Sequence, residues 1–176
     1  MNTKDVNDEL LNLTRLAEQG DSNAQVNLGN FYADGKDIID KRVYWLNLAT
    51  VMLFGQIVRR NYNKAMQWYQ KAADQGNAGA QYNLARMYAG GFGTKRDYKK
   101  AFDLYLMSAM QGLEFSQYIV GWMYQRGHGV TRDFIQSYKW LSLASLNGHD
   151  KAAQLRKIVA KRMKRDKITE AEKLVE

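Results

Sequence analysis

The chain has 176 residues, of which 45% are hydrophobic and 25% are charged, and its formal net charge at pH 7 is +8. This composition is typical of a folded protein and excludes a mainly disordered chain. Because there is no cysteine, disulfide scaffolds, iron–sulfur clusters and cysteine nucleophiles are excluded. Proline is also absent, which favours continuous helices.

No stretch approaches the roughly 18 apolar residues needed to span a bilayer. The longest apolar run, residues 48–55, contains Thr50 and ends at Gly55. The N-terminal residues show neither a basic region nor an apolar segment of the kind found in signal peptides. We therefore expect a cytoplasmic protein, or a periplasmic or secreted one if a leader has been removed.

The first predicted helix covers residues 5–19 and ends before Gly20. Residues 24–35 then match residues 80–91 at an offset of 56, and residues 46–55 repeat residues 26–35 at an offset of 20. We interpret 46–55 as a second copy of the same helix, whose preceding partner helix is shortened or lost. The prediction for residues 21–60 is therefore an irregular first repeat or repeats, with the conformation of 36–60 left open.

From residue 61 onward the chain repeats every 36 residues, and such periods are typical of stacked helical units. The residues that recur at this spacing include Gly76, Gly112 and Gly148, and also Asn61, Asp97 and Asp133. In one unit, positions 81, 84, 85 and 88 form a stripe on a first helix, and the glycines that follow end it. Asp97 caps a second helix that ends before Gly112. The same pair is predicted at 114–126 and 133–147.

The C-terminal segment is predicted to add one or two basic capping helices, broken near Arg165 and Asp166. Together these elements predict one all-α domain over residues 1–176, a right-handed α-solenoid of about three to four antiparallel helix pairs. Its predicted parts are an N-terminal helix (1–20), the irregular region (21–60), the regular repeats (61–112 and 113–148) and the cap (149–176).

Three stretches carry a recognisable motif. They are Ala-x-Ala-Gln-Tyr-Asn-Leu at 78–84 with Tyr88, Gly91 and Gly93, then Asp-Tyr-x-Lys-Ala at 97–101, and residues 68–76. This pattern resembles the Sel-one-like repeat family, relatives of the tetratricopeptide repeats, over most of residues 23–148. The tail at 151–174 is similar to the C-terminal cap of many bacterial members. The resemblance implies an α-solenoid adaptor in assembly, signalling or host interaction, whose first helices usually line the concave side.

The chain departs from the family pattern in two places. The family often has proline in the loop between the helices, where this sequence has Arg59, Lys95 and Thr131. The spacing within 36–60 also differs from the family's, so the resemblance defines no groove in that segment.

Small residues inside the predicted first helices indicate close helix packing. Gly29, Ala85 and Gly121 lie there, although a helical glycine costs up to about 1 kcal/mol relative to alanine. Aromatic residues at helical spacing are also interpreted as core, namely Trp68, Tyr69, Tyr105 and Trp140.

Candidate protein-binding residues lie on the opposite face of the first helices. They are Asn27, Asn30, Asn83, Arg86, Ile119, Trp122 and Arg126. Asparagine can donate to and accept from an extended backbone, and arginine and tryptophan are frequent hot-spot residues, so this face predicts a concave peptide groove. The alternatives are ordinary surface for the polar members and burial against the next unit for Trp122.

The net charge is concentrated near the C-terminus. Seven basic residues stand there against one acid, and they are Arg156, Lys157, Lys161, Arg162, Lys164, Arg165 and Lys167. A basic face of this kind attracts nucleic acid, an acidic protein or an anionic membrane surface. The alternative is a solvated outer face of a cap whose apolar side packs on the last repeat.

Catalytic and metal-binding motifs find little support. His128 lies within a glycine loop and His149 follows a glycine that ends a helix, and neither has a catalytic motif around it. The glycine-rich stretches at 90–93 and 127–129 lack the Gly-Lys-Ser/Thr of phosphate loops, so we interpret them as turns. Two histidines without cysteines or a carboxylate cluster predict no metal site. We expect no enzymatic activity and no cofactor.

The sequence therefore predicts a monomeric, non-enzymatic bacterial scaffold or adaptor that binds a partner protein. An inhibitor or immunity-type protein that neutralises a toxin is one alternative. A nucleic-acid-associated protein that uses the basic C-terminal segment is the other.

Overall fold

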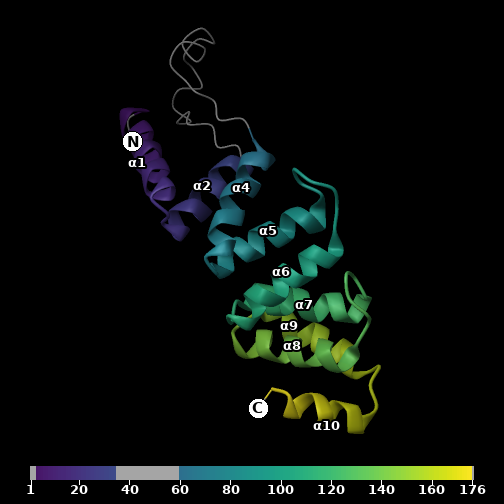
Figure 1. Ribbon diagram of the computed structural model, residues 1–176. Coiled ribbons are helices and arrows are strands. Elements are labelled where there is room, and N and C mark those ends of the chain that lie inside the picture. Colours follow the sequence, from purple (N-terminus) through teal and green to yellow (C-terminus); the bar gives the residue numbers. More distant parts are fainter. Residues whose placement is uncertain (1–2, 35–59, 176) are drawn as a thin grey trace, which may run out of the picture. The chain divides into compact units, whose positions relative to one another are not determined.

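The computed structural model describes residues 3–34 and 60–175 and is drawn in Figure 1. Both described ranges consist of helices joined by turns and loops, without a strand in either, which confirms the predicted all-α class. The chain divides into two compact units, Met1–Asn77 and Ala78–Glu176. The predicted helix at 46–55 lies outside the described residues, and so does nearly all of the irregular segment 36–60.

The described residues of the first unit form three helices, with the second between the other two. They are α1 (Thr3–Glu18), α2 (Ser22–Asp34) and α4 (Tyr62–Asp74). α2 packs against both α1 and α4. Ala17, Ala24 and Leu28 are buried at their contacts, and the half-buried Trp68 of α4 packs against them. The N-terminal helix is therefore present as predicted, and Gly20 follows it with a φ of 99°.

The second unit is a succession of helix pairs. Its helices are α5 (Ala78–Gly90), α6 (Tyr98–Met110), α7 (Glu114–Arg126), α8 (Phe134–Leu146), α9 (Asp150–Ala160) and α10 (Arg165–Lys173). Each helix from α6 to α9 packs on the helix before it, and α10 packs on α8. The helices predicted at 114–126 and 133–147 are confirmed as α7 and α8.

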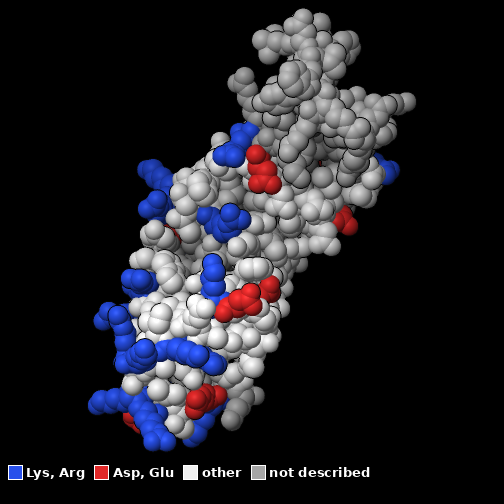
Figure 2. Space-filling model, turned by 180° about the vertical axis from the view of Figure 1, so that it is seen from behind, with Lys and Arg blue, Asp and Glu red and all other residues white. Residues whose placement is uncertain are grey.

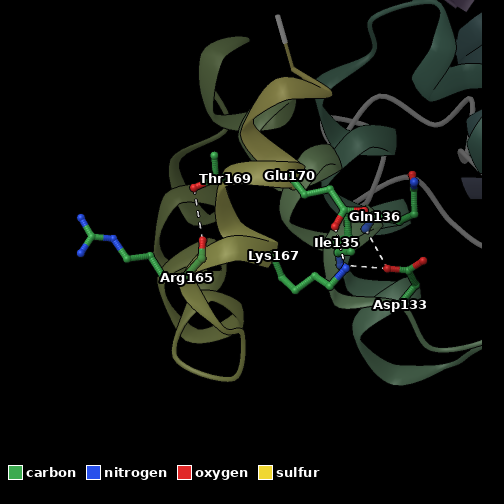
Figure 3. A network of polar contacts seen from close by, with 7 residues as sticks. All are labelled: Asp133, Ile135, Gln136, Arg165, Lys167, Thr169 and Glu170. Carbon is green, nitrogen blue, oxygen red and sulfur yellow. Dashed lines mark hydrogen bonds and ion pairs between the residues drawn. The ribbon is translucent and has the colours of Figure 1, made fainter.

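The predicted helix caps are confirmed. An Oδ1 of Asp97 accepts a hydrogen bond from the backbone N of Lys100 at 3.0 Å. Asp133 accepts from the backbone N of Ile135 at 2.8 Å and of Gln136 at 3.0 Å, as Figure 3 shows. These bonds satisfy first-turn amides that have no partner within the helix, so each second helix begins at the same place in its repeat.

The capping segment consists of two helices, and the sequence predicted one or two. α9 ends at Ala160 and α10 begins at Arg165, so the break comes just before the predicted position. Ala152, Val159 and Ala171 are buried, and they form a core cluster with residues of α8 that include Leu141. The apolar side of the cap therefore packs on the last repeat.

Close helix approach explains the glycines inside two first helices. A Cβ on Gly121 would stand 2.7 Å from Cγ of Leu141, and a Cβ on Gly29 would stand 2.5 Å from Cε1 of Tyr69. Both distances are too short for a real Cβ, so the partner helix occupies the space that a side chain would need. The predicted packing role of these glycines is confirmed.

Candidate protein-binding surfaces

In the first unit, the predicted binding face contributes two asparagines with different surroundings. Asn27 is exposed on α2. Asn30 is half-buried, and its Oδ1 accepts a hydrogen bond from the hydroxyl of Tyr69 at 2.7 Å. Since Tyr69 is a core residue of α4, Asn30 helps to hold α2 against α4, and Asn27 is the more accessible of the two.

On α5 the predicted face combines an amide with an arginine. Asn83 is half-buried, whereas Arg86 is exposed with its guanidinium carbon 5.8 Å from the centroid of the Tyr82 ring. Tyr82 in turn meets the buried Tyr105 edge to face at 5.8 Å. Burial raises the pKa of Tyr105 well above its usual range, Tyr82 raises it further, and the positive charge of Arg86 opposes the shift. Arg86 therefore lies over a ring that itself packs against a buried tyrosine.

On α7 the predicted face is partly core. Ile119 and Trp122 are half-buried and pack against the cluster that contains Val120 and Trp140. The indole of Trp122 also meets the ring of His128 edge to face at 4.9 Å. Packing against this cluster and His128 thus accounts for part of the Trp122 surface, whereas the alternative interpretation was burial against the next unit. Arg126, at the end of the helix, is exposed.

A pair of side-chain amides recurs at the turns that lead from a second helix to the next first helix. Nε2 of Gln111 donates to Oε1 of Gln81 at 2.8 Å, and Nδ2 of Asn147 donates to Oε1 of Gln117 at 2.9 Å. Gln117 also donates to the carbonyl of Ala109 at 3.2 Å. Gln81 and Gln117 are buried, so these amides are structural. No role was predicted for these amides from the sequence, although Gln111 and Asn147 stand 36 residues apart beside the recurring turn glycines.

Two members of the basic C-terminal segment make contacts inside the unit. Arg156 is half-buried, lies 5.6 Å from the ring centroid of Tyr138 and contacts Oγ of Ser142 at 3.4 Å. Lys167 pairs with Glu170 at 2.7 Å, as Figure 3 shows, and this hydrogen bond raises the pKa of Lys167. The other five members are exposed, namely Lys157, Lys161, Arg162, Lys164 and Arg165.

Two arginines that were not predicted from the sequence lie in the loops before α6 and α8, one in each loop. The guanidinium of Arg96 lies 5.8 Å from the ring centroid of Tyr98, and that of Arg132 lies 5.6 Å from the ring centroid of Phe134. Both arginines are exposed. The signal that could have found them is their spacing of 36 residues, which is the period of the repeat.

The two histidines lie in aromatic surroundings. His128 stacks on Tyr98 with ring centroids 5.2 Å apart, and His149 stacks on Tyr118 at 4.2 Å. The Nδ1 atom of each is buried and has no hydrogen-bond partner among the described residues. The described part of the chain brings no three metal-ligating side chains together.

No helix in the described ranges is both long and apolar enough to cross a membrane. The Sel1 repeat model matches four segments, residues 22–41, 46–77, 78–113 and 115–149, which together make up more than half of the chain. A comparison with curated proteins found no match.

Three solved structures are similar to the chain. The crystal structure of a Sel1 repeat protein from Oxalobacter formigenes superposes with a TM-score of 0.68 and 28% sequence identity, over 85% of this chain and 97% of that one. A protective antigen present in uropathogenic Escherichia coli strains, which displays an SLR fold, gives a TM-score of 0.65 and 28% identity over 94% of this chain. This chain covers 39% of the antigen's own length.

Helicobacter pylori cysteine rich protein B gives a TM-score of 0.60 and 17% identity, over 88% of this chain and 97% of that one, and supports the fold alone. Sel1 repeat proteins are generally protein-interaction scaffolds. The matched segments, the recurring helix pairs and the solved relatives lead to one conclusion. The chain belongs to the Sel1 repeat family, and its fold class is the α-solenoid of antiparallel helix pairs.

Proposed function

We propose that this chain is a non-enzymatic bacterial scaffold or adaptor that binds a partner protein through the exposed face of its first helices. The observation that carries the proposal is Arg86, which is exposed on α5 and held over Tyr82 beside Asn83. Arginine and tyrosine are enriched among residues that dominate protein–protein binding. An arginine that is already positioned by a ring loses less side-chain entropy when a partner binds.

The exposed end of α7 extends this face. Arg126 offers a second guanidinium, and the part of Trp122 that stays accessible offers apolar surface. Arginine and amide groups can bond to backbone carbonyls and carboxylates, so the face suits a polypeptide partner. An inhibitor or immunity-type protein would use the same face and would differ only in what its partner does.

The test is affinity capture from a lysate of the source cell, with and without nuclease, followed by mass spectrometry. We compare the unmodified chain with Asn83→Ala/Arg86→Ala. The matched control is Lys151→Ala/Gln154→Ala, which also removes one cation and one amide, both from exposed positions on α9. Circular dichroism verifies that both variants remain helical.

We expect one stoichiometric protein that survives nuclease, is retained by the control variant and is lost at least roughly tenfold on the face variant. Equal retention by both variants would remove this face as the binding site. Recovery of nuclease-sensitive material alone would instead support the nucleic-acid alternative that the basic C-terminal segment suggested.

A further inference from the structure

The formal charge of the chain is unevenly shared between its two units. Residues 1–77 carry equal numbers of basic and acidic residues, so the whole of the +8 belongs to residues 78–176. Within that second unit, exposed basic residues gather at the loops that lead from a first helix to the second helix of the same pair. They are Lys95, Arg96, Lys99, Lys100, Arg132, Lys161, Arg162, Lys164 and Arg165, and we call them the basic edge.

The fold brings these three loops to the same side of the second unit. In Figure 1 the α5–α6, α7–α8 and α9–α10 connections all lie toward the right of the view. In Figure 2, seen from behind, the Lys and Arg side chains of this unit gather along the corresponding left side. The basic edge therefore lies along one side of the unit, although its members are spread over 71 positions of the sequence, from Lys95 to Arg165.

The acidic residues at this side are largely engaged by their own helices. Asp97 and Asp133 accept hydrogen bonds from first-turn amides, and Asp103 pairs with Lys99 at 2.6 Å. Lys99 is the one member of the basic edge that forms an ion pair with a described acidic residue. In Figure 3 the Arg165 side chain extends away from the other labelled residues. The remaining cations of the edge are therefore available to an external anionic group.

The opposite side of the unit has a different character. The turns at 111–113 and 147–149 contain neither lysine nor arginine, and the helices that follow them begin with Glu114 and Asp150. A negatively charged partner is therefore attracted more strongly to the basic edge than to the turn side, which favours binding at the edge.

The rings of the basic edge hold its arginines in place. Binding of single-stranded nucleic acid depends on aromatic rings that are open to stacking bases. Phe134 is half-buried beneath Arg132, and His128 stacks on Tyr98, which stays 37% exposed beside Arg96. The rings therefore offer limited surface to bases, while they position both guanidinium groups for a carboxylate. A planar guanidinium binds a carboxylate through two parallel hydrogen bonds.

We propose that the basic edge binds an acidic, extended segment of the partner protein, rich in aspartate and glutamate. Alternate residues of an extended chain stand about 6.5 to 7 Å apart on one face, so carboxylates at every second position present a row of negative charge to the edge. The inference rests on the proposed function, because it supplies a second contact surface for the same protein partner.

The test uses the full chain and a short fluorescein-labelled peptide of alternating Glu and Ser residues, with fluorescence anisotropy at about 0.15 M salt as the readout. A Gln–Ser peptide of equal length controls for charge, and a single-stranded RNA and a DNA duplex of equal charge are the competing probes. The edge variant is Arg96→Gln/Arg132→Gln. The matched control, Lys151→Gln/Lys173→Gln, removes the same charge from exposed positions outside the edge.

We expect the acidic peptide to bind, the Gln–Ser peptide not to bind, and affinity to fall roughly tenfold in the edge variant but less than about twofold in the control. Three results would each overturn the proposal: no binding of the acidic peptide, equal weakening by both variants, or tighter binding of either nucleic acid than of the peptide. Failure here leaves capture through Asn83 and Arg86 unaffected, so it is distinguishable from failure of the proposed function.

Discussion

Both sides of the second unit carry polar residues that recur with the repeat, but the two sides use them differently. At the turns after α6 and α8, Gln111 and Asn147 donate to the buried amides of Gln81 and Gln117. At the loops before α6 and α8, Arg96 and Arg132 recur with the same period and lie on aromatic rings, exposed to solvent. Recurrence at the period of the repeat therefore does not by itself distinguish a structural residue from a binding residue.

What distinguishes them is whether the polar group must find a hydrogen-bond partner inside the fold. A buried amide must find a hydrogen-bond partner, since leaving it without one costs about 1 to 3 kcal/mol, and the next turn supplies that partner each time. An exposed guanidinium has no such requirement because water solvates it. The turn side is thus expected to respond to substitution through stability, and the loop side through binding.

The largest expected effect concerns the glycines of the two sides. Gly129 has a φ of 71°, and a Cβ there would overlap the carbonyl oxygen of Tyr98. Gly148 has a φ of 90°, and a Cβ there would meet nothing within 4 Å. We expect Gly129→Ala to lower the free energy of unfolding by about 3 kcal/mol or more, through both strain and overlap, and Gly148→Ala by about 1 to 2 kcal/mol, through strain alone.

Urea unfolding of the two variants, followed by circular dichroism, measures this difference. Equal losses would mean that the loop at 127–133 moves away from Tyr98 at little cost. The contrast between a loop that contacts its neighbour and a turn that stands alone would then fail.

The second prediction addresses the amide pair. Gln117→Met keeps the side-chain length but removes the bonds to Ala109 and Asn147, and should lower the free energy of unfolding by about 1 to 3 kcal/mol. Asn147→Ala should cost less, because Asn147 is exposed. In a double-mutant cycle the two losses should not add, since they remove the same hydrogen bond. Additive losses would show that the hydrogen bond between Gln117 and Asn147 contributes nothing to stability.

The third prediction uses Tyr105, which lies in the core between the two sides. Burial raises the pKa of Tyr105, so the folded state holds the phenolic proton more tightly than the unfolded state does. Its contribution is complete below the unfolded pKa of about 10 and is lost as pH rises above that value, by up to about 1.4 kcal/mol per pH unit.

We therefore expect the free energy of unfolding to fall less steeply with rising pH in Tyr105→Phe than in the unmodified chain. Urea titrations run below and above pH 10 measure this difference. Parallel pH profiles for the two proteins would show that Tyr105 ionises as easily in the folded state as in the unfolded state.

Much of the helical framework could be predicted because its signals are local. Asp97 and Asp133 indicate where their helices begin, because each caps the helix through hydrogen bonds to amides two or three residues away. Gly121 indicated that two helices pack closely, because glycine is otherwise unfavourable within a helix. Each of these signals needs only a few neighbouring residues, and the period of 36 then repeats it.

The candidate surfaces were less predictable because they depend on distant groups. Asn30 was chosen as a binding residue, yet its carbonyl accepts from Tyr69, which is 39 residues away across the irregular segment. Trp122 satisfied the expected spacing on its helix, but it packs against His128 and against the core cluster that contains Val120 and Trp140. Arg96 and Arg132 could have been found from their period alone. That their loops lie on the same side of the unit could be seen only in the fold.

The smallest expected effect on stability tests the loop side directly. Arg132 is exposed, and its contact with Phe134 is of a kind that contributes about 0.5 to 1 kcal/mol at exposed sites. Arg132→Gln should therefore lower the free energy of unfolding by less than about 1 kcal/mol, less than Gln117→Met, in the same urea assay. If it costs as much as the amide variant, Arg132 is part of the packing of its loop. The two sides would then be alike, and weakened peptide binding by Arg96→Gln/Arg132→Gln would have to be attributed to a disturbed loop. A small loss, together with weakened peptide binding, assigns Arg132 to recognition, because packing cannot explain a change in affinity that leaves stability intact.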